Sequence, residues 1–305
     1  MNTFYLTTAD NHQTFVRNWL IEHPKAIVQI VHGMNEHSNR YDEFARFLNE
    51  KGFTVYATDH RGHGHSALDE ERVGYIGENG FHLMVNDENE LFHHIQAQLP
   101  HTPHFMLGHS MGSFIAQRYI QLYTHGLDGV ILLGSGGPRS DLRLGALVAE
   151  MIEKANRDQR MKTLERVIFN GYNSRFIKKT GFEWLANDPT VINSFLSDPF
   201  CGHIFPPSFF RQFLNFMQLI FKNEEVNKVS TSMPILILSG SNDPVGQYGK
   251  GTDKLYKQYQ SIGITNLKYK LYPDERHEIL NDYNRHQVFE DILYWLNEQL
   301  DACYH

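Results

Sequence analysis

Short apolar runs alternate with longer amphipathic stretches along most of the chain. Runs rich in Val, Ile, Leu and Tyr lie between turn-forming residues and predict strands at 26–32, 53–58, 104–107, 129–134, 234–239 and 266–272. Helical periodicity between them predicts helices at 41–51, 83–99, 111–123, 249–261 and 285–300. Strands joined by helices of this length indicate an α/β fold with a mostly parallel, doubly wound sheet. Residues 3–20 alternate as an antiparallel hairpin does, and we expect them at one edge of that sheet.

One segment, 136–230, breaks this alternation. It contains helical patterns around 142–156, 161–169, 182–184 and 208–221 but no clear strand. We therefore predict a core formed by residues 1–135 and 231–305, with a helical cap (lid) at 136–230 inserted between two core strands. A cap in this position covers the carboxyl edge of the sheet, where open α/β sheets bind their ligands.

Composition narrows the classes of function. The 305 residues include 28 Lys and Arg against 35 Asp and Glu, a formal charge of −7, which argues against binding to a nucleic-acid backbone. Two cysteines cannot form a disulfide framework for a chain of this length, and we see neither a signal peptide nor an apolar run of about 20 residues. We therefore expect a reduced, cytoplasmic setting. The sequence makes no prediction of the oligomeric state.

The strongest local motif is Gly-His-Ser-Met-Gly at 108–112, between a predicted strand and a predicted helix. That context is typical of a nucleophile elbow, in which the serine sits on a sharp turn with its hydroxyl exposed. The glycines on either side relieve the steric clashes of such a turn. Ser110 is therefore the candidate nucleophile, and an incidental Gly-Ser turn is the alternative.

A serine hydroxyl needs a base to remove its proton and an acid to orient that base. In this architecture the acid and then the histidine follow the serine along the chain. Asp243 and His277 each come just after a predicted strand, on the same sheet edge as Ser110. Each assignment has an alternative. Asp243 could instead cap the following helix. His286 is another histidine but lies within the last predicted helix, and Asp59 also ends a strand but precedes the serine.

Acyl transfer also requires an oxyanion hole, formed by backbone N–H groups directed at the developing negative charge. One donor is expected from Met111, the residue after the nucleophile. The second is expected from the turn that follows the strand at 26–32, where we select Met34.

These motifs together resemble those of the monoacylglycerol lipase and lysophospholipase group of α/β-hydrolases. The resemblance rests on His-Gly-Met-Asn-Glu-His-Ser-Asn-Arg-Tyr at 32–41, Asp-His-Arg-Gly-His-Gly-His-Ser at 59–66, the elbow, and the segments 240–246 and 272–280. It implies a serine esterase with a helical cap that acts on a lipid monoester. It also assigns Ser110, Asp243, His277, Met34 and Met111 the roles given above.

The histidine-rich stretch at 60–65 invites a metal-site interpretation. Its alternating glycines suit a tight loop instead, and no cluster of Cys or carboxylate residues with ligand spacing accompanies it. We therefore expect no metal and no cofactor.

The stretch 208–221 is the most apolar helical pattern of the cap. Phe209, Phe213, Phe216 and Ile220 form one stripe and Phe210, Met217 and Phe221 another. Packing of the cap on the core explains such stripes, and a wall for an acyl chain is the functional alternative. Cys201 is either a residue at the entrance or a small buried hydrophobe.

The sequence leaves three hypotheses about the function. The first is hydrolysis of a monoacylglycerol or lysophospholipid through an acyl-enzyme on Ser110. The second is aminopeptidase-type cleavage, with Glu36 as a group that could bind the substrate ammonium. The third is a non-catalytic ligand-binding member of the fold. The charge of −7 disfavours docking on anionic membranes but allows transient contact of an apolar cap with a membrane or micelle.

Overall fold

A computed structural model describes residues 1–67, 69–155, 160–169 and 171–303. Its centre is an eight-stranded sheet in the order β1-β2-β4-β3-β5-β6-β7-β8. β1 (Asn2–Thr7) and β2 (Gln13–Trp19) form an antiparallel hairpin at one edge, as the alternation of 3–20 predicts. β2 pairs antiparallel with β4, and all later pairs are parallel. This arrangement is that of the α/β-hydrolase fold and confirms the predicted fold class.

The parallel strands coincide closely with the predicted runs. They are β3 (Ala26–Val31), β4 (Phe53–Thr58), β5 (His104–His109), β6 (Gly129–Leu133), β7 (Ile235–Gly240) and β8 (Leu267–Tyr272). Every residue of β3 to β7 is buried, because helices cover both faces of the sheet. Side chains of β6 alternate between two cores: Val130 and Leu132 enter one, and Ile131 and Leu133 enter the other.

The core helices also match the predicted periodicity. α1 (Asp42–Glu50) and α10 (Arg285–Cys303) pack on one face of the sheet, and α2 (Gly80–Gln98), α3 (Met111–Leu122) and α9 (Lys250–Ser261) pack on the other. Three short 3₁₀ helices, η1 (Ser38–Tyr41), η2 (Gly64–Ala67) and η3 (Glu70–Arg72), lie in loops after β3 and β4. Because the parallel strands share one direction, the loops at their carboxyl ends meet along a single edge of the sheet.

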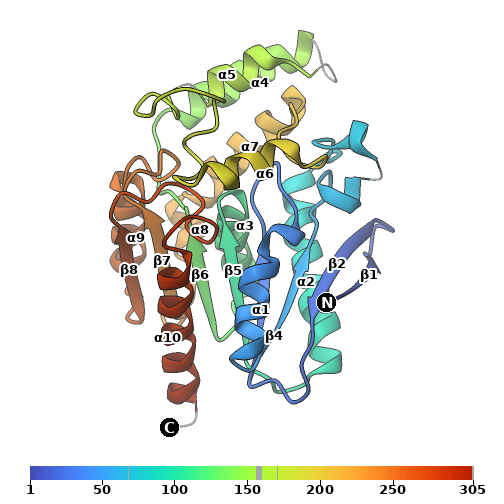
Figure 1. The fold of residues 1–305 in the computed structure, drawn as a ribbon, viewed down its shortest axis with the longest axis vertical. Helices are drawn as coiled ribbons and strands as arrows, with labels where there is room; N and C mark the ends of the chain where they lie inside the picture. The colour runs from blue at the N-terminus through green and yellow to red at the C-terminus, as the bar shows by residue number, and fades with distance from the viewer. Residues whose placement is uncertain (68, 156–159, 170, 304–305) are drawn as a thin grey trace.

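Between β6 and β7 the described residues form helices and no strand. They are α4 (Leu142–Ala155), α5 (Lys162–Ile168), α6 (Pro189–Ser197), α7 (Pro207–Ile220) and α8 (Asn223–Val226). α4 and α5 lie across the top of the molecule in Figure 1, above the carboxyl ends of the strands. The last residue of the helix predicted at 142–156 falls outside the described residues.

The helix predicted around 182–184 is wrong. These residues form a turn in which the N–H of Leu185 donates to the carbonyl of Phe182 (3.0 Å). The carboxylate of Glu183 accepts the backbone N–H groups of Lys179, Thr180 and Gly181, and this ties the segment into a loop. The helix begins later, at Pro189, where the side chain of Asp188 caps it.

No helix in the described ranges combines the length and the apolar character needed to cross a bilayer.

Candidate active site

The elbow has the strained geometry that its sequence predicts. Ser110 lies between β5 and α3 with φ 52° and ψ −120°, a conformation that L-residues rarely adopt. A Cβ on Gly108 would lie 2.4 Å from the carbonyl oxygen of Gly112, and a Cβ on Gly112 would lie 2.0 Å from that of Val31. Neither position has room for a side chain, so the two glycines are required for the turn to form.

The structure brings Asp243 and His277 together at the same edge. Asp243 follows β7 and is fully buried, and its Oδ2 lies 3.0 Å from Nδ1 of His277, which follows β8. The Ser239 hydroxyl donates to Oδ2 (3.2 Å) and the Val245 N–H donates to Oδ1 (2.8 Å). These two hydrogen bonds therefore fix the carboxylate in the orientation that faces the imidazole.

The alternatives weighed from the sequence lie elsewhere. Asp243 does not cap α9, whose N-cap is Gly249. His286 is on the exposed side of α10, next to Glu43. Asp59 is buried after β4, where its carboxylate accepts the N–H groups of Ser38 and His65.

The two candidate oxyanion donors line the same cavity as Ser110 and His277. The N–H of Met111 is the first of α3 and has no acceptor within the helix. Met34 lies in the turn after β3, and its N–H makes no hydrogen bond to any group in the described part of the chain. Both groups are therefore available to a ligand atom.

A buried carboxylate shapes the turn that contains Met34. Oε1 of Glu36 accepts the N–H of Gly33 (2.7 Å) and the hydroxyl of Tyr41 (2.9 Å), and it lies 3.1 Å from Nδ1 of His109. Oε2 pairs with Arg40 (3.0 Å). The turn after β3 and the elbow after β5 are thus held by one side chain.

The electrostatics of this cluster favour an ion pair. Burial favours the neutral acid, but the hydrogen bond from His109 and the charge of Arg40 outweigh it, so the pKa of Glu36 lies well below its usual value. Burial likewise favours neutral His109, but the hydrogen bond and charge of Glu36 outweigh it and raise the pKa of His109. The ring of His109 also packs against that of His277, with centroids 4.8 Å apart.

A cavity of about 870 Å³ lies between these loops and the cap. This volume is within the range of sites that bind small organic ligands. Most of its lining residues come from the segment between β6 and β7, where apolar side chains are interspersed with charged ones such as Arg139, Glu165 and Lys178. The site can therefore hold a molecule that is largely apolar and still has polar groups.

α7 directs one face at this cavity, and that face is rotated from the predicted stripe. Phe210, Phe213, Leu214 and Met217 line the cavity. Of the candidate substrate-binding residues in the sequence, Phe213 therefore lies at the cavity, while Phe209, Phe216 and Cys201 are not among its lining residues. Phe209 and Phe216 pack against Phe81 of α2, and Cys201 is buried beside Leu185 and Phe195.

The sequence reasoning missed Trp184 of the cap. Its ring lies 5.1 Å from that of His277, and its carbonyl oxygen accepts the N–H of His277 (3.4 Å). The N–H of Glu278 donates to the carbonyl of Leu185 (2.8 Å). The loop that carries His277 therefore packs on residues 184–185, next to the turn at 182–184 for which the sequence pattern predicts a helix, and no local signal in the sequence marks this contact.

Comparison with known proteins gives consistent matches. The family model described as serine aminopeptidase, S33, matches residues 22–284. A monoglyceride lipase of Homo sapiens is 27% identical over 97% of this chain and 90% of its own length. A monoacylglycerol lipase of Mycolicibacterium smegmatis is 24% identical over 91% of this chain and 90% of its own length. A carboxyl esterase from Bacillus coagulans, solved in complex with glycerol, is 33% identical with a TM-score of 0.91 and 98% coverage of both chains.

Proposed function

Because the chain belongs to the serine aminopeptidase S33 family, we propose that it is a serine carboxylester hydrolase acting on a lipid monoester, a monoacylglycerol or a lysophospholipid. The observation that carries the proposal is that Ser110 and His277 line one mostly apolar cavity, and that His277 is paired with the buried carboxylate of Asp243. The relatives named as monoglyceride lipases and as a carboxyl esterase support the same reaction class.

In this mechanism each residue has one task. His277 removes the proton of Ser110 as the hydroxyl oxygen attacks the ester carbonyl, and Asp243 stabilises the imidazolium. The N–H groups of Met34 and Met111 bind the oxyanion. His277 then gives its proton to the leaving alcohol, and water hydrolyses the acyl-enzyme by the same steps in reverse order. No cofactor or metal takes part in these steps.

Residues 136–230 would act as the cap that selects the substrate. Phe213, Leu214 and Met217 supply an apolar wall from α7, and each methylene of an acyl chain buried there contributes about 0.8 kcal/mol. Long acyl chains are therefore favoured over short ones.

The aminopeptidase alternative is less well supported. It needs a carboxylate free to bind the substrate ammonium, and the candidate was Glu36. Its two oxygens already face the N–H of Gly33, the hydroxyl of Tyr41, the ring of His109 and the guanidinium of Arg40. A non-catalytic role is also disfavoured, because such proteins usually lack a member of the triad and all three candidates are present here.

The test is the release of free fatty acid from an equal mixture of 1-oleoylglycerol and oleoyl-lysophosphatidylcholine. We expect hydrolysis by the wild type, and a loss of turnover of roughly 10⁴–10⁶-fold in Ser110→Ala. Faster hydrolysis of one of the two esters shows which head group, glycerol or phosphocholine, the enzyme prefers. A Ser110→Ala variant with near-wild-type turnover, or faster cleavage of aminoacyl-naphthylamides than of either ester, contradicts the proposal.

We further propose that the cap makes transient contact with a membrane or micelle. The cap exposes large apolar side chains on and near α4 and α5: Leu144, Leu147, Met151, Val167 and Ile177. Leu144, Leu147 and Met151 recur at helical spacing on α4, and Met151 is 72% exposed. A helix face of this kind inserts into the interface of a bilayer.

The contact is tested by flotation with neutral phosphatidylcholine vesicles. We expect the wild type to float and Leu147→Asp/Met151→Asp not to, while both hydrolyse a monomeric short-chain ester equally, because neither residue lines the cavity. Equal flotation of the two proteins contradicts the contact without touching the ester hydrolysis.

A reducing, cytoplasmic compartment is part of the proposal. Its support is the low cysteine content and the free, buried thiol of Cys201.

A further inference from the structure

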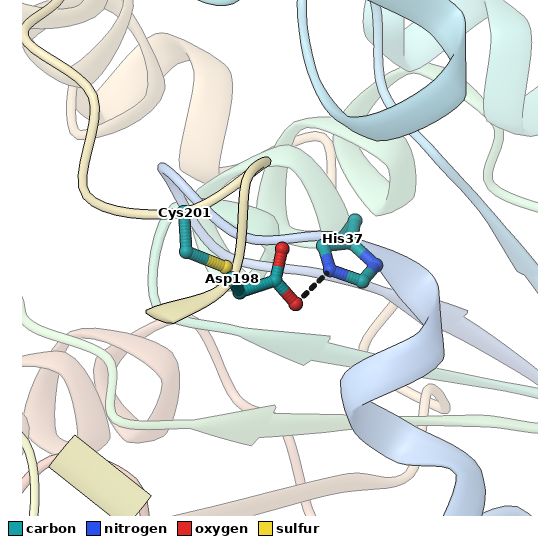
Figure 2. Close-up of side chains that lie close together, drawn as sticks. All are labelled: His37, Asp198 and Cys201. Carbon is teal, nitrogen blue, oxygen red and sulfur yellow. Dashed lines mark hydrogen bonds and ion pairs between the residues drawn. The ribbon is translucent and has the colours of Figure 1, made fainter. Parts of the chain in front are cut away.

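A second group of chemically competent side chains lies outside the cavity, where a cap loop meets the core. It consists of His37, just before η1 in the core, and Asp198 and Cys201 in the loop after α6 (Figure 2). Nitrogen, oxygen and sulfur atoms of the three side chains all lie within 4.8 Å of one another. The proposed ester hydrolysis uses none of them.

The fold holds the three groups from both sides. In the cap loop, the N–H of Cys201 donates to the carbonyl of Asp198 (3.1 Å), and this turn puts their side chains on one side. The N–H of Phe200 binds Oδ1 of Asp198 (2.9 Å), so that Oδ2 faces Nε2 of His37 (2.9 Å). In the core, the next residue, Ser38, is anchored by its N–H to Asp59 (2.9 Å). The cluster is therefore part of the fold and not an accident of one side-chain conformation.

The donor set has a clear chemical preference. Imidazole nitrogen, carboxylate oxygen and thiolate sulfur are the ligands of Zn²⁺, whereas Mg²⁺ and Ca²⁺ prefer oxygen alone. His37 and Cys201 are buried and Asp198 is partly exposed, so an ion has an approach from solvent and a water molecule can complete a tetrahedron. The ordinary alternative is a His–Asp pair next to an inert buried thiol.

We propose that His37, Asp198 and Cys201 bind a Zn²⁺ ion that fastens the cap loop to the core. Nε2 of His37 and Oδ2 of Asp198 each supply a lone pair, and Cys201 binds as the thiolate after its proton passes to solvent. The site lies beside the segment that carries Met34, so the ion would restrain the cap relative to the active-site loops. The inference is independent of the proposed function, since it concerns binding alone.

The hydrogen bonds and charges around the three side chains are compatible with a bound cation. Nδ1 of His37 is buried and has no hydrogen-bond partner among the described residues, so the ion replaces one contact of this ring and not a network. Arg40 is the nearby cation, and Glu36 and Glu278 both pair with it. Together with Asp198 the carboxylates outnumber the guanidinium.

The test uses Co²⁺, which reports thiolate ligation by a sulfur-to-metal charge-transfer absorption, followed by competition with Zn²⁺. The full chain carries Cys303→Ser, so that Cys201 is its remaining thiol. We expect one equivalent of Co²⁺ to produce the band and Zn²⁺ to displace it. Cys201→Ser should abolish the band, and Asp198→Asn, which keeps a polar partner for His37, should weaken Zn²⁺ binding at least tenfold, in the range seen when the surroundings of a metal site are altered.

Because the chain has 18 histidines, the matched control is His286→Gln, which removes an exposed histidine next to Glu43. It should leave the band and the affinity unchanged. Saturating Zn²⁺ should also raise the Tm of the Cys303→Ser chain and not that of the Cys201→Ser variant. Absence of the band in a folded chain, or equal Zn²⁺ affinity with and without Cys201, overturns the proposal and leaves the ester hydrolysis untouched.

Discussion

The imidazole of His277 and the carboxylate of Asp243 meet at 3.0 Å, although they come from loops after different strands. The carboxylate is fully buried and hydrogen-bonded on both oxygens. An exposed pair of this kind contributes little to stability, whereas in the proposed triad a buried carboxylate at this distance orients the imidazole. In the proposed mechanism, the imidazole held in this way removes the proton of the Ser110 hydroxyl.

We therefore predict that Asp243→Asn lowers kcat by about 10⁴-fold, as expected when the acid that orients the base is neutralised. The geometry should be retained, because an amide fills the same space. Asp274→Asn is the matched control: this aspartate lies in the loop of His277 but is exposed, and its φ of 60° suits asparagine. Steady-state hydrolysis of a p-nitrophenyl ester checks both. A fall of less than tenfold in Asp243→Asn means that another residue supports His277.

The positions of Asp243 and His277 can be predicted from the sequence, because that prediction needs only the strand ends and the chain order. Buried parallel strands read as uninterrupted apolar runs, so β3 to β7 and the residues after them could be predicted. The turn at Phe182 could not, because the carboxylate of Glu183 decides it through three backbone contacts. The start of α6 at Asp188-Pro189, by contrast, carries a helix N-terminal signal in the sequence.

The residues of the proposed cap that face the substrate cannot be predicted from the sequence, for a physical reason. Both stripes of α7 are apolar, because the helix packs on α2 and also lines the cavity, and Phe213 does both. Periodicity alone therefore does not say which residues meet the substrate. The meeting of His37 with Asp198 and Cys201 depends on how the cap loop lies on the core, and no spacing along the chain encodes it.

The residues of α7 that line the cavity give the second prediction. Phe213→Ala removes part of the cavity wall, so kcat/KM for a long-chain ester should fall about tenfold while that for an acetyl ester changes little, given about 0.8 kcal/mol for each methylene left unburied. Phe216→Ala is the matched substitution on the buried face. It should lower the free energy of unfolding by about 3–5 kcal/mol without altering chain-length preference. Identical chain-length profiles for Phe213→Ala and the wild type contradict the assignment of the wall.

Buried histidines give the third prediction. Burial lowers the pKa of His60 to about 3 and that of His63 to about 4. Below pH 6.5 the unfolded chain therefore binds protons that the folded chain does not, and each such group removes about 1.4 kcal/mol of stability per pH unit until its folded pKa is reached. Buried carboxyls act in the opposite direction: burial raises the pKa of Glu88 to about 7, so its protonation favours the folded state below that pH.

The total pH dependence is thus a sum, and a substitution is needed to isolate one group. In His63→Asn the titrating ring is absent, so the loss of stability between pH 6.5 and 4 should be smaller than in the wild type by about 1.4 kcal/mol per unit. Urea unfolding at pH 7, 6 and 5 measures the difference. His286→Gln, at an exposed site, should follow the wild type. Parallel curves for His63→Asn and the wild type would show that His63 titrates normally in the folded protein.

The fourth prediction concerns Asn35, the residue after the candidate oxyanion donor Met34. Its Nδ2 donates to the carbonyl of His203 (2.7 Å) and its Oδ1 accepts the N–H of His203 (2.9 Å), so the side chain joins the oxyanion turn to the cap loop. Its φ of 64° is one that asparagine and glycine adopt most readily. Asn35 is therefore a positioning residue, and the substitution that isolates the two hydrogen bonds from backbone strain is Asn35→Gly.

We expect Asn35→Gly to lower kcat about tenfold or more, since two hydrogen bonds of about 0.5–1.5 kcal/mol each no longer hold the turn. KM should change less, because the apolar wall is intact. Asn11→Gly is the matched control, with the same substitution at φ 65° in the exposed turn between β1 and β2. Its kinetics should equal those of the wild type. If Asn35→Gly instead raises KM and leaves kcat unchanged, the two hydrogen bonds between Asn35 and His203 affect only substrate binding, and the position of the Met34 N–H does not depend on them.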